Sequence, residues 1–229
     1  MKKPVFTDVH INKLGIIGLG SKTTTYYIEM LNQLYNKKHG EFNTCPFTMI
    51  NINFNEINPF LPNDNININR NALPYLHYID SLKISELLIP NITIHQAIDN
   101  LIITEKFNFK LIHPVDLLIS HLKLNGIENV IILGTKHTME GNYIQSKLKQ
   151  NNIYVTKVTE NVIKEIEKIR IEIYNGNLEY KKNYLTKFAK SQPNLKVILA
   201  CTELSVLANQ NSLFIDMATL QIKKAIENL

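Results

Sequence analysis

The run Leu14–Gly18 (LGIIG) is short, apolar and closed by glycine, a pattern typical of a buried parallel β-strand that turns into a helix. A helix is expected directly after it, over residues 23–38. Alternating residues at 47–54 predict a second strand, and residues 86–90 predict a third after a helix at 73–82. Strands that alternate with helices in this way indicate a parallel sheet covered by helices.

The same alternation continues through the second half of the chain. Further strands are predicted at residues 129–134, 153–158, 196–200 and 213–215, and further helices at 93–103, 139–151, 162–175, 178–190 and 219–228. The two comparable halves divide near residues 112–117. We therefore expect an α/β protein with one lobe from residues 1–112 and 213–229 and a second from 113–212. Because ligands bind beyond the carboxyl ends of parallel strands, two such lobes would enclose a cleft.

Length and composition indicate an ordinary globular protein. The chain has 229 residues, of which 45% are hydrophobic and 20% charged, which excludes disordered, collagenous and coiled-coil chains. Two cysteines cannot build a disulfide framework, so free thiols are expected. No segment approaches the ~18 consecutive apolar residues of a spanning helix, so we expect a soluble, cytoplasmic protein without a membrane partner.

The net charge of +5 does not indicate a nucleic-acid partner. Nucleic-acid binding needs clustered basic residues, whereas the lysines here are scattered beside glutamates, and only Arg70 and Arg170 are arginines. The charge is therefore interpreted as a solvated surface.

The loop after the first predicted strand contains Gly20, Ser21 and Lys22 and leads into a helix. Free backbone N–H groups at a helix start can hold an anion, and a carboxylate would suit this loop. The loop lacks the glycine spacing of a dinucleotide site or of a phosphate loop, so a simple tight turn is an equally good interpretation.

Cys201 directly follows the strand predicted at 196–200 and precedes a helix. Backbone N–H groups at such a position stabilise a thiolate, which can act as a nucleophile or base. A buried structural thiol is the alternative, but the polar residues Thr202 and Glu203 that follow at once favour a functional role. Cys45 precedes a strand instead of following one and is interpreted as structural.

Several segments together resemble the aspartate/glutamate racemase family. Residues 200–204 (ACTEL) resemble its second catalytic motif, and residues 134–140 (GTKHTME) are similar to its central Gly-Thr-x-x-Thr-Met-Glu segment. Thr93 and His95 match the end of its first motif, Cys-Asn-Thr-x-His, and the loop after Gly18 stands where the family has its N-terminal loop. The resemblance extends through most of the chain in the family's order.

This resemblance implies two Rossmann-like, pseudo-symmetric lobes, a homodimer, and racemisation without pyridoxal phosphate, any other cofactor or a metal. The implied substrate is a small acidic amino acid or a dicarboxylate. Inverting an α-carbon removes a proton from one face and returns one to the other, so two acid/base groups must flank the substrate. Donors around the α-carboxylate must also stabilise the carbanion.

The first motif departs from the family, because the family's catalytic cysteine falls at Asn91, whose amide cannot act as a base near neutral pH. The candidate catalytic residues are Cys201, Asn91 and Thr93, with Cys201 as the thiol acid/base. The candidate substrate contacts are Gly20, Ser21, Lys22, Asn53, His95, Thr135, Thr138, Thr202, Glu203 and Arg170.

Alternatives remain for individual residues and for the reaction. His95 is expected to cap or orient the first motif. A role as proton donor is the more specific alternative. Arg170 offers a bidentate fork for a carboxylate, and an exposed surface side chain is its alternative. Because one thiol suffices to protonate a carbanion, a one-cysteine decarboxylase or another lyase is an alternative to a racemase. A homologue that binds a small acid without turning it over is the third hypothesis for the function.

Overall fold

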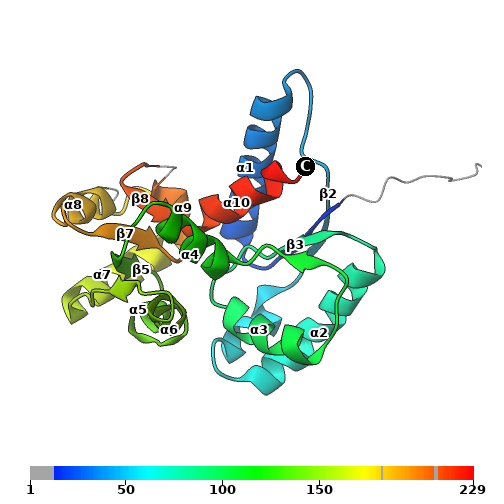
Figure 1. Cartoon of the computed structure of the whole chain (residues 1–229), viewed down its shortest axis with the longest axis horizontal. Helices are drawn as coiled ribbons and strands as arrows, with labels where there is room; N and C mark the ends of the chain where they lie inside the picture. Colours follow the sequence, from blue (N-terminus) through cyan, green and yellow to red (C-terminus); the bar gives the residue numbers. More distant parts are fainter. Residues whose placement is uncertain (1–12, 182, 209–210) are drawn as a thin grey trace, which may run out of the picture.

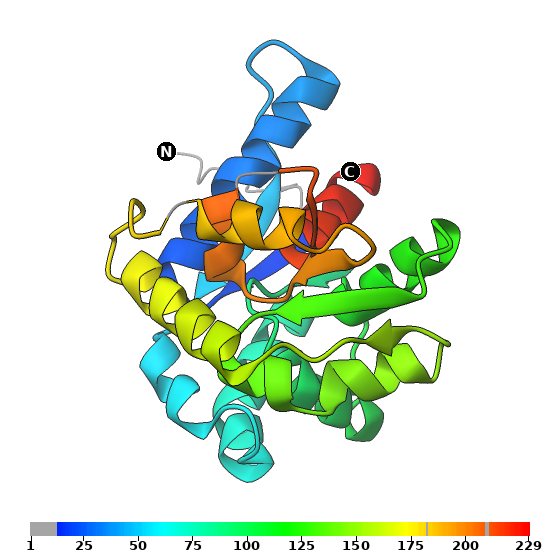
Figure 2. The same cartoon turned by 90° about the vertical axis from the view of Figure 1, so that its left-hand side faces the viewer.

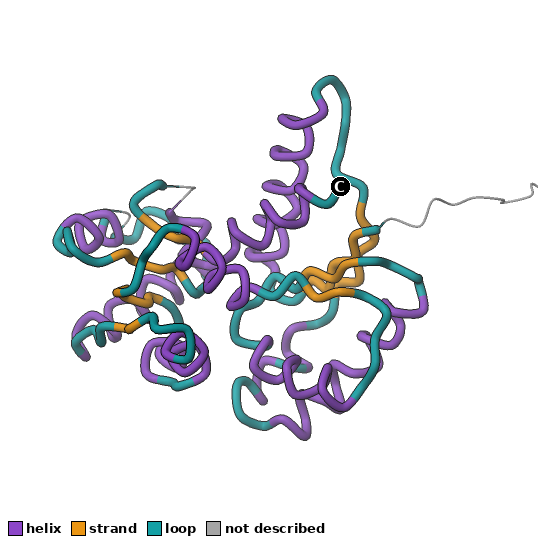
Figure 3. Tube along the Cα trace, viewed as in Figure 1, coloured by secondary structure: helices purple, strands orange, loops and turns teal. Residues whose placement is uncertain are grey.

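The chain forms two lobes, each built on a four-stranded parallel sheet (Figure 1, Figure 3). The computed structural model describes residues 13–181, 183–208 and 211–229. The first sheet contains β1 (Leu14–Gly18), β2 (Phe47–Asn51), β3 (Glu86–Leu88) and β4 (Lys110–Leu111), in the order β2-β1-β3-β4. The second contains β5 (Asn129–Leu133), β6 (Tyr154–Val155), β7 (Lys196–Leu199) and β8 (Phe214–Asp216), in the order β6-β5-β7-β8. Counted from the first strand of each lobe, the spatial order of the strands is the same in both sheets, so the two lobes have the same topology. The predicted α/β class is confirmed.

Helices cover both faces of each sheet. They are α1 (Ser21–His39), α2 (Asn65–Ser81), α3 (His95–Thr104), α4 (Pro114–Leu124), α5 (Lys136–Glu140), α6 (Tyr143–Lys149), α7 (Glu160–Tyr174), α8 (Tyr184–Lys190), α9 (Thr202–Ala208) and α10 (Met217–Glu227), with short 3-10 helices η1 (Phe54–Glu56) and η2 (Asn58–Phe60). On the first sheet, α2 and α3 pack on one face and α1 and α10 on the other (Figure 1). On the second sheet, α7, α8 and α9 cover one face and α4 and α6 the other; Figure 2 turns this lobe toward the viewer.

Successive residues of each central strand pack into opposite helical layers. In β1, Ile16 packs with α1 and α10, while Ile17 packs with α2 and α3. In β5, Ile131 and Ile132 divide between the two layers in the same way. Side chains of a strand point alternately to its two faces, so a sheet covered on both faces needs apolar residues at every position. This is why short continuous apolar runs predicted the strands.

The C-terminal segment crosses from one lobe to the other. β8 pairs in parallel with β7, so residues 214–216 belong to the second sheet and not to the first lobe, where the expected division placed them. The strand extends the sheet at the edge of β7. α10 then returns to the first lobe, where Ile222 and Ala225 are buried against α1. Residues 1–12 of the expected first lobe lie outside the described residues.

The helix boundaries differ from the expected ones in several places. α2 begins well before the helix expected at 73–82, because Ile68 continues its buried face through an asparagine-rich segment. The helix expected at 139–151 is interrupted at Gly141 and forms α5 and α6. The helix expected at 178–190 is limited to α8, and α4, at the division between the lobes, was not expected at all.

Candidate active site

A cavity of about 190 Å³ lies between the lobes, where β3, β5 and β7 end. Its first-lobe wall includes Asn91 and Thr93, which follow β3, and apolar residues of the loop around η2. Its second-lobe wall is formed by Thr135, His137, Arg170, Ala200, Cys201, Thr202 and Glu203. Ligands of open α/β sheets bind beyond the carboxyl ends of the strands, and this cavity has that position in both lobes at once.

Cys201 connects β7 to α9. Its carbonyl oxygen accepts hydrogen bonds from the backbone N–H groups of Leu204 and Ser205, at 3.0 and 3.3 Å, which start the helix. The Sγ–H donates to the Glu203 carboxylate across 2.8 Å. Only 4% of the residue is exposed, yet it lines the cavity, so it is not sealed inside the core.

The protonation of Cys201 differs from what a thiol at a helix start suggests. Burial and the Glu203 carboxylate raise the pKa of Cys201 well above its usual value, and the nearby Arg170 guanidinium opposes this shift only in part. The protein without ligand therefore holds Cys201 as a thiol near neutral pH, ready to donate a proton.

Arg170 reaches the cavity from α7, with 25% of its side chain exposed. Its Nη2 donates to Glu167 across 2.9 Å, and Glu167 also accepts a hydrogen bond from the backbone N–H of Lys136 at the start of α5. The buried Nε of Arg170 has no hydrogen-bond partner among the described residues. This arrangement fixes a cation beside Cys201 and leaves a donor for a ligand, which favours the carboxylate-binding interpretation over a surface arginine.

Asn91 organises the first motif. Its Oδ1 accepts from the backbone N–H of Ile94 at 3.0 Å, and its carbonyl oxygen accepts from Nδ1–H of His95 at 2.7 Å. The Nδ2 amide makes no hydrogen bond within the described ranges of the chain, so it can serve a ligand in the cavity. Asn91 is thus placed to donate a hydrogen bond and not to move a proton.

His95 lies beneath this motif, with no exposed surface, and does not line the cavity. Burial, together with the neighbouring His113, lowers the pKa of His95 to about 3, so its ring is neutral. Its contact with Asn91 supports the loop, as the first interpretation held. A proton-donating role is not supported, because the ring is neutral and has no access to the cavity.

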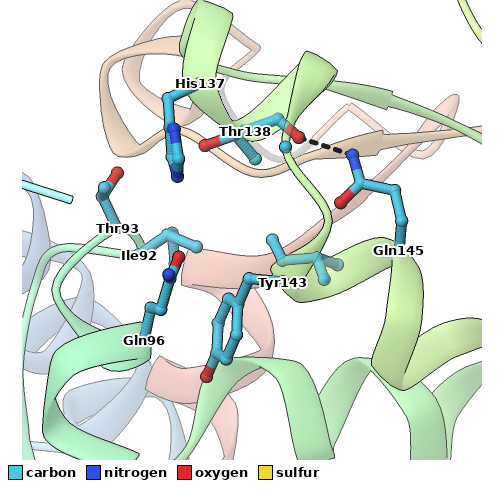
Figure 4. Close-up of a pocket in the computed structure, with 9 residues that line it drawn as sticks. Ile92, Thr93, Gln96, His137, Thr138, Tyr143 and Gln145 are labelled. Atoms are coloured by element: carbon cyan, nitrogen blue, oxygen red, sulfur yellow. Dashed lines mark hydrogen bonds between the residues drawn. The ribbon is translucent and has the colours of Figure 1, made fainter. Parts of the chain in front are cut away.

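Two threonines and a histidine surround the start of α5. Thr135 caps the helix, its Oγ1 accepting from the backbone N–H of Thr138 at 3.1 Å and lying 2.8 Å from the Thr138 hydroxyl. Thr135 lines the cavity, while Thr138 lines a smaller adjoining pocket (Figure 4). His137 lines both, although the sequence interpretation did not select it. Its position shortly after a strand end was the signal that could have identified it.

Several of the predicted contacts lie elsewhere. Gly20 caps α1 and its carbonyl oxygen accepts from the Thr23 hydroxyl at 3.1 Å, while Ser21 and Lys22 are exposed. Asn53 is exposed and caps η1 through a 3.2 Å bond to the backbone of the next turn. None of these residues lines the cavity, so the glycine loop has the geometry of the tight turn that was its alternative interpretation.

A polar network joins the lobes beside the site. Asp99 of α3 accepts hydrogen bonds from the Tyr143 hydroxyl and from Lys147 Nζ, both at 2.7 Å and both from α6. It also lies 3.2 Å from Nε2 of His113, which caps α4 at the connection between the lobes. These contacts connect the helix that follows the first motif to the helix that follows α5.

No group of three or more His, Cys, Asp and Glu side chains among the described residues could hold a metal ion. None of the described helices has the length and apolar character needed to cross a membrane.

Solved structures with the same fold are racemases and a racemase homologue. An aspartate racemase homologue from Pyrococcus horikoshii OT3 has a TM-score of 0.78 and 23% identity over 95% of this chain and 98% of that one. An aspartate racemase from Picrophilus torridus has a TM-score of 0.69 and 22% identity over 94% and 93%. A glutamate racemase from Campylobacter jejuni subsp. jejuni has a TM-score of 0.57 and 16% identity over 94% and 84%.

No curated protein matches the sequence. The sequence pattern that defines a family, described as Asp/Glu/Hydantoin racemase, matches residues 16–225, nearly the whole chain. The chain belongs to the Asp/Glu/Hydantoin racemase family.

Proposed function

We propose that the protein is an amino-acid racemase that inverts the α-carbon of a small acidic amino acid without pyridoxal phosphate. The observation that carries this proposal is the position of Cys201, which faces Asn91 and Thr93 of the other lobe across one cavity. A thiol at that place can exchange a proton with a carbon held between the lobes.

The cavity also offers the donors that a carbanion needs. Removing the α-proton places negative charge on the α-carboxylate, and fixed hydrogen-bond donors stabilise that charge. The Nε of Arg170, the amide of Asn91 and the hydroxyls of the cavity threonines are such donors. We assign the α-carboxylate to Asn91 and Thr93 and the distal carboxylate to Arg170. Family membership supports the reaction type, and the acidic substrate is our inference from these donors.

Exchange of the α-hydrogen tests the proposal. The full-length protein is incubated in D2O with each enantiomer of aspartate and of glutamate, and ¹H NMR and chiral chromatography follow the α-position. Deuterium incorporation with inversion is the expected result, and Cys201→Ser should reduce it by about 100-fold or more. Cys45→Ser provides the matched control, because Cys45 is buried in the core of the first lobe, away from the cavity.

The same experiment distinguishes the proposed racemase from the alternative functions. Exchange with retention in the wild-type protein would indicate a half-reaction at one thiol. Loss of CO2 from a malonate-type substrate would identify a decarboxylase. Binding of a small dicarboxylate without exchange of any acidic amino acid would show a protein without turnover and would overturn the proposal.

We also propose that the chain forms a homodimer in the cytoplasm. Light scattering on the full-length chain should then give about twice the subunit mass of 26.4 kDa.

A further inference from the structure

We propose that His137, which lines the cavity next to Ile92 and Thr93 of the first lobe, is the second acid/base group and works together with Cys201. This inference rests on the proposed racemase function. It supplies what the first motif lacks, a side chain that can take up and release a proton near the first lobe.

His137 reaches from the second lobe toward the first motif. It lies in the first turn of α5, shortly after β5 ends, yet it shares both of its pockets with Ile92 and Thr93 of the first lobe. Figure 4 shows the imidazole pointing from α5 toward Thr93 and Gln96. Cys201 approaches from β7, so the two groups enter the cavity from different elements.

The remaining titratable groups of this cavity cannot take the role. Of its lining residues, Arg170, Cys201, Glu203 and His137 can carry a charge. Arginine keeps its proton in proteins. Glu203 accepts the hydrogen bond from the Cys201 thiol and therefore lies on the side of that group. His137 is the group left to face it.

The ring of His137 is packed against its own helix, while, in the described part of the chain, its nitrogens are free to bind a substrate. It packs over Gly141, where an added Cβ would lie 3.5 Å from both Cε1 and Nε2. Neither ring nitrogen has a hydrogen-bond partner within the described residues. The polar groups that share a pocket with it include Tyr143 of α6, Gln96 of α3 and Arg170 of α7. Glu203 of α9 also lines the larger cavity, and its carboxylate accepts the hydrogen bond from the Cys201 thiol.

The protonation states of the two groups are complementary. Partial burial lowers the pKa of His137, so its imidazole is neutral near neutral pH, while Cys201 is a thiol. A neutral ring nitrogen of His137 takes the α-proton, the C–H bond breaks, and the electron pair passes into the α-carboxylate. The Cys201 S–H then gives its proton to the opposite face of the carbon. This leaves an imidazolium and a thiolate, which is the form needed to convert the opposite enantiomer back.

The test uses deuterium exchange of each enantiomer separately, in neutral and mildly alkaline D2O, with a substrate that the wild-type protein racemises. His137→Gln should reduce racemisation by about 100-fold or more. It should retain exchange, without inversion, for one enantiomer only, and this exchange should increase with pH, because Cys201 serves one face and takes up the α-proton only as a thiolate. Cys201→Ser should retain exchange for the opposite enantiomer. A structural role for His137 would not produce this complementary pattern.

Controls keep the result interpretable. His77→Gln replaces an exposed histidine outside the cavity and should match the wild type. His137→Asn is a second variant for the case that the first does not fold, and circular dichroism checks both. Adding Asn91→Cys to His137→Gln should restore racemisation, since a thiol then serves the same face.

Wild-type rates in folded His137→Gln or His137→Asn would overturn the role of His137 and leave the racemase proposal intact. Loss of exchange for the same enantiomer in the His137 and Cys201 variants would also overturn it. If the wild-type protein exchanges no acidic amino acid, the proposed function fails first, and the role of His137 fails with it.

Discussion

Burial raises the pKa of Cys201 most, and the Glu203 carboxylate raises it further. The carboxylate accepts the thiol's hydrogen bond, and its charge disfavours a second negative charge 2.8 Å away. Replacing it by Glu203→Gln should therefore lower the pKa of Cys201, because the repulsion disappears while the volume is kept. The rate of alkylation of Cys201 by iodoacetamide, followed by peptide mass spectrometry across pH, measures this shift. Cys45 in the same sample is the internal control, since burial alone raises its pKa to about 11. An unchanged alkylation profile for Cys201 would contradict the assignment.

Arg170 lines the cavity while the Nη2 of its guanidinium donates to Glu167. Arg170→Lys keeps the charge but removes the planar fork and the Nε donor, so we expect a Kd for a small dicarboxylate about 10-fold higher. Isothermal titration calorimetry provides the measurement. Arg70→Lys is the matched control, because Arg70 is exposed on α2 and does not line the cavity. Equal affinities of the two variants would remove Arg170 from the site.

The site residues that the sequence predicted are those whose position follows from a strand end. Asn91, Thr135 and Cys201 each come shortly after a buried strand, and parallel strands bring their carboxyl ends together. Asn53 follows β2 in the same manner but bonds to its own loop, because a 3-10 turn begins at once. His137 could not be selected from its residue type alone; its position shortly after β5 was the available signal, and the structure adds that its side chain lines the cavity.

Asp216 links β8, α9 and α10. Its carboxylate accepts from Ser205 Oγ at 2.6 Å, from the Thr219 hydroxyl at 2.6 Å and from the backbone N–H groups of Ala218 and Thr219. Asp216→Ala removes the cap of α10 and leaves these buried donors unpaired, so the free energy of unfolding should fall by about 2–3 kcal/mol in urea titrations.

Asp64→Ala is the control for this experiment. Asp64 also caps a helix, α2, but it is exposed, and its loss should cost about 0.5–1 kcal/mol. Equal costs for the two variants would show that the additional bonds of Asp216 contribute nothing.

The strands were easier to predict than the helices. Ile131, Ile132 and their equivalents must be apolar because both faces of each sheet are covered, and this leaves a clear signal. At the start of α2, asparagines alternate with isoleucines, and this period of two conceals the helical face on which Ile68 is buried while Ile66 is exposed. α4 begins at Pro114, and His113-Pro114 indicates a turn as readily as the start of a helix, so the sequence did not predict this helix.

Asp99 is the main polar connection between the lobes. Burial raises the pKa of its carboxyl, but bonds from His113, Lys147 and Tyr143 outweigh this and lower it below the ordinary 3.8. Asp99→Asn should reduce the free energy of unfolding by about 1–3 kcal/mol near neutral pH. A carboxyl whose pKa falls on folding stabilises the protein fully above its unfolded pKa, and this contribution is lost as the pH falls toward the folded pKa. The difference from the wild type should therefore shrink as the pH falls below about 4.

Urea titrations over this pH range, combined with Lys147→Met and the double variant, measure the coupling between the two side chains. Lys147 and Asp99 are both partly buried, so removing either should remove most of their joint contribution. Additive effects of the two single variants would show that the contact contributes nothing across the lobes.

The return of the chain to its first lobe limits how the protein can be divided. α10 supplies Ala218, Ile222 and Ala225 to the apolar layer over β1, after the chain has completed the second sheet. A fragment that stops after residue 112 would display that layer to water, and would associate non-specifically until a peptide carrying α10 covered it. During synthesis the first lobe must wait until residues 217–227 have left the ribosome, so its folding is completed only after the strands of the second sheet have been made.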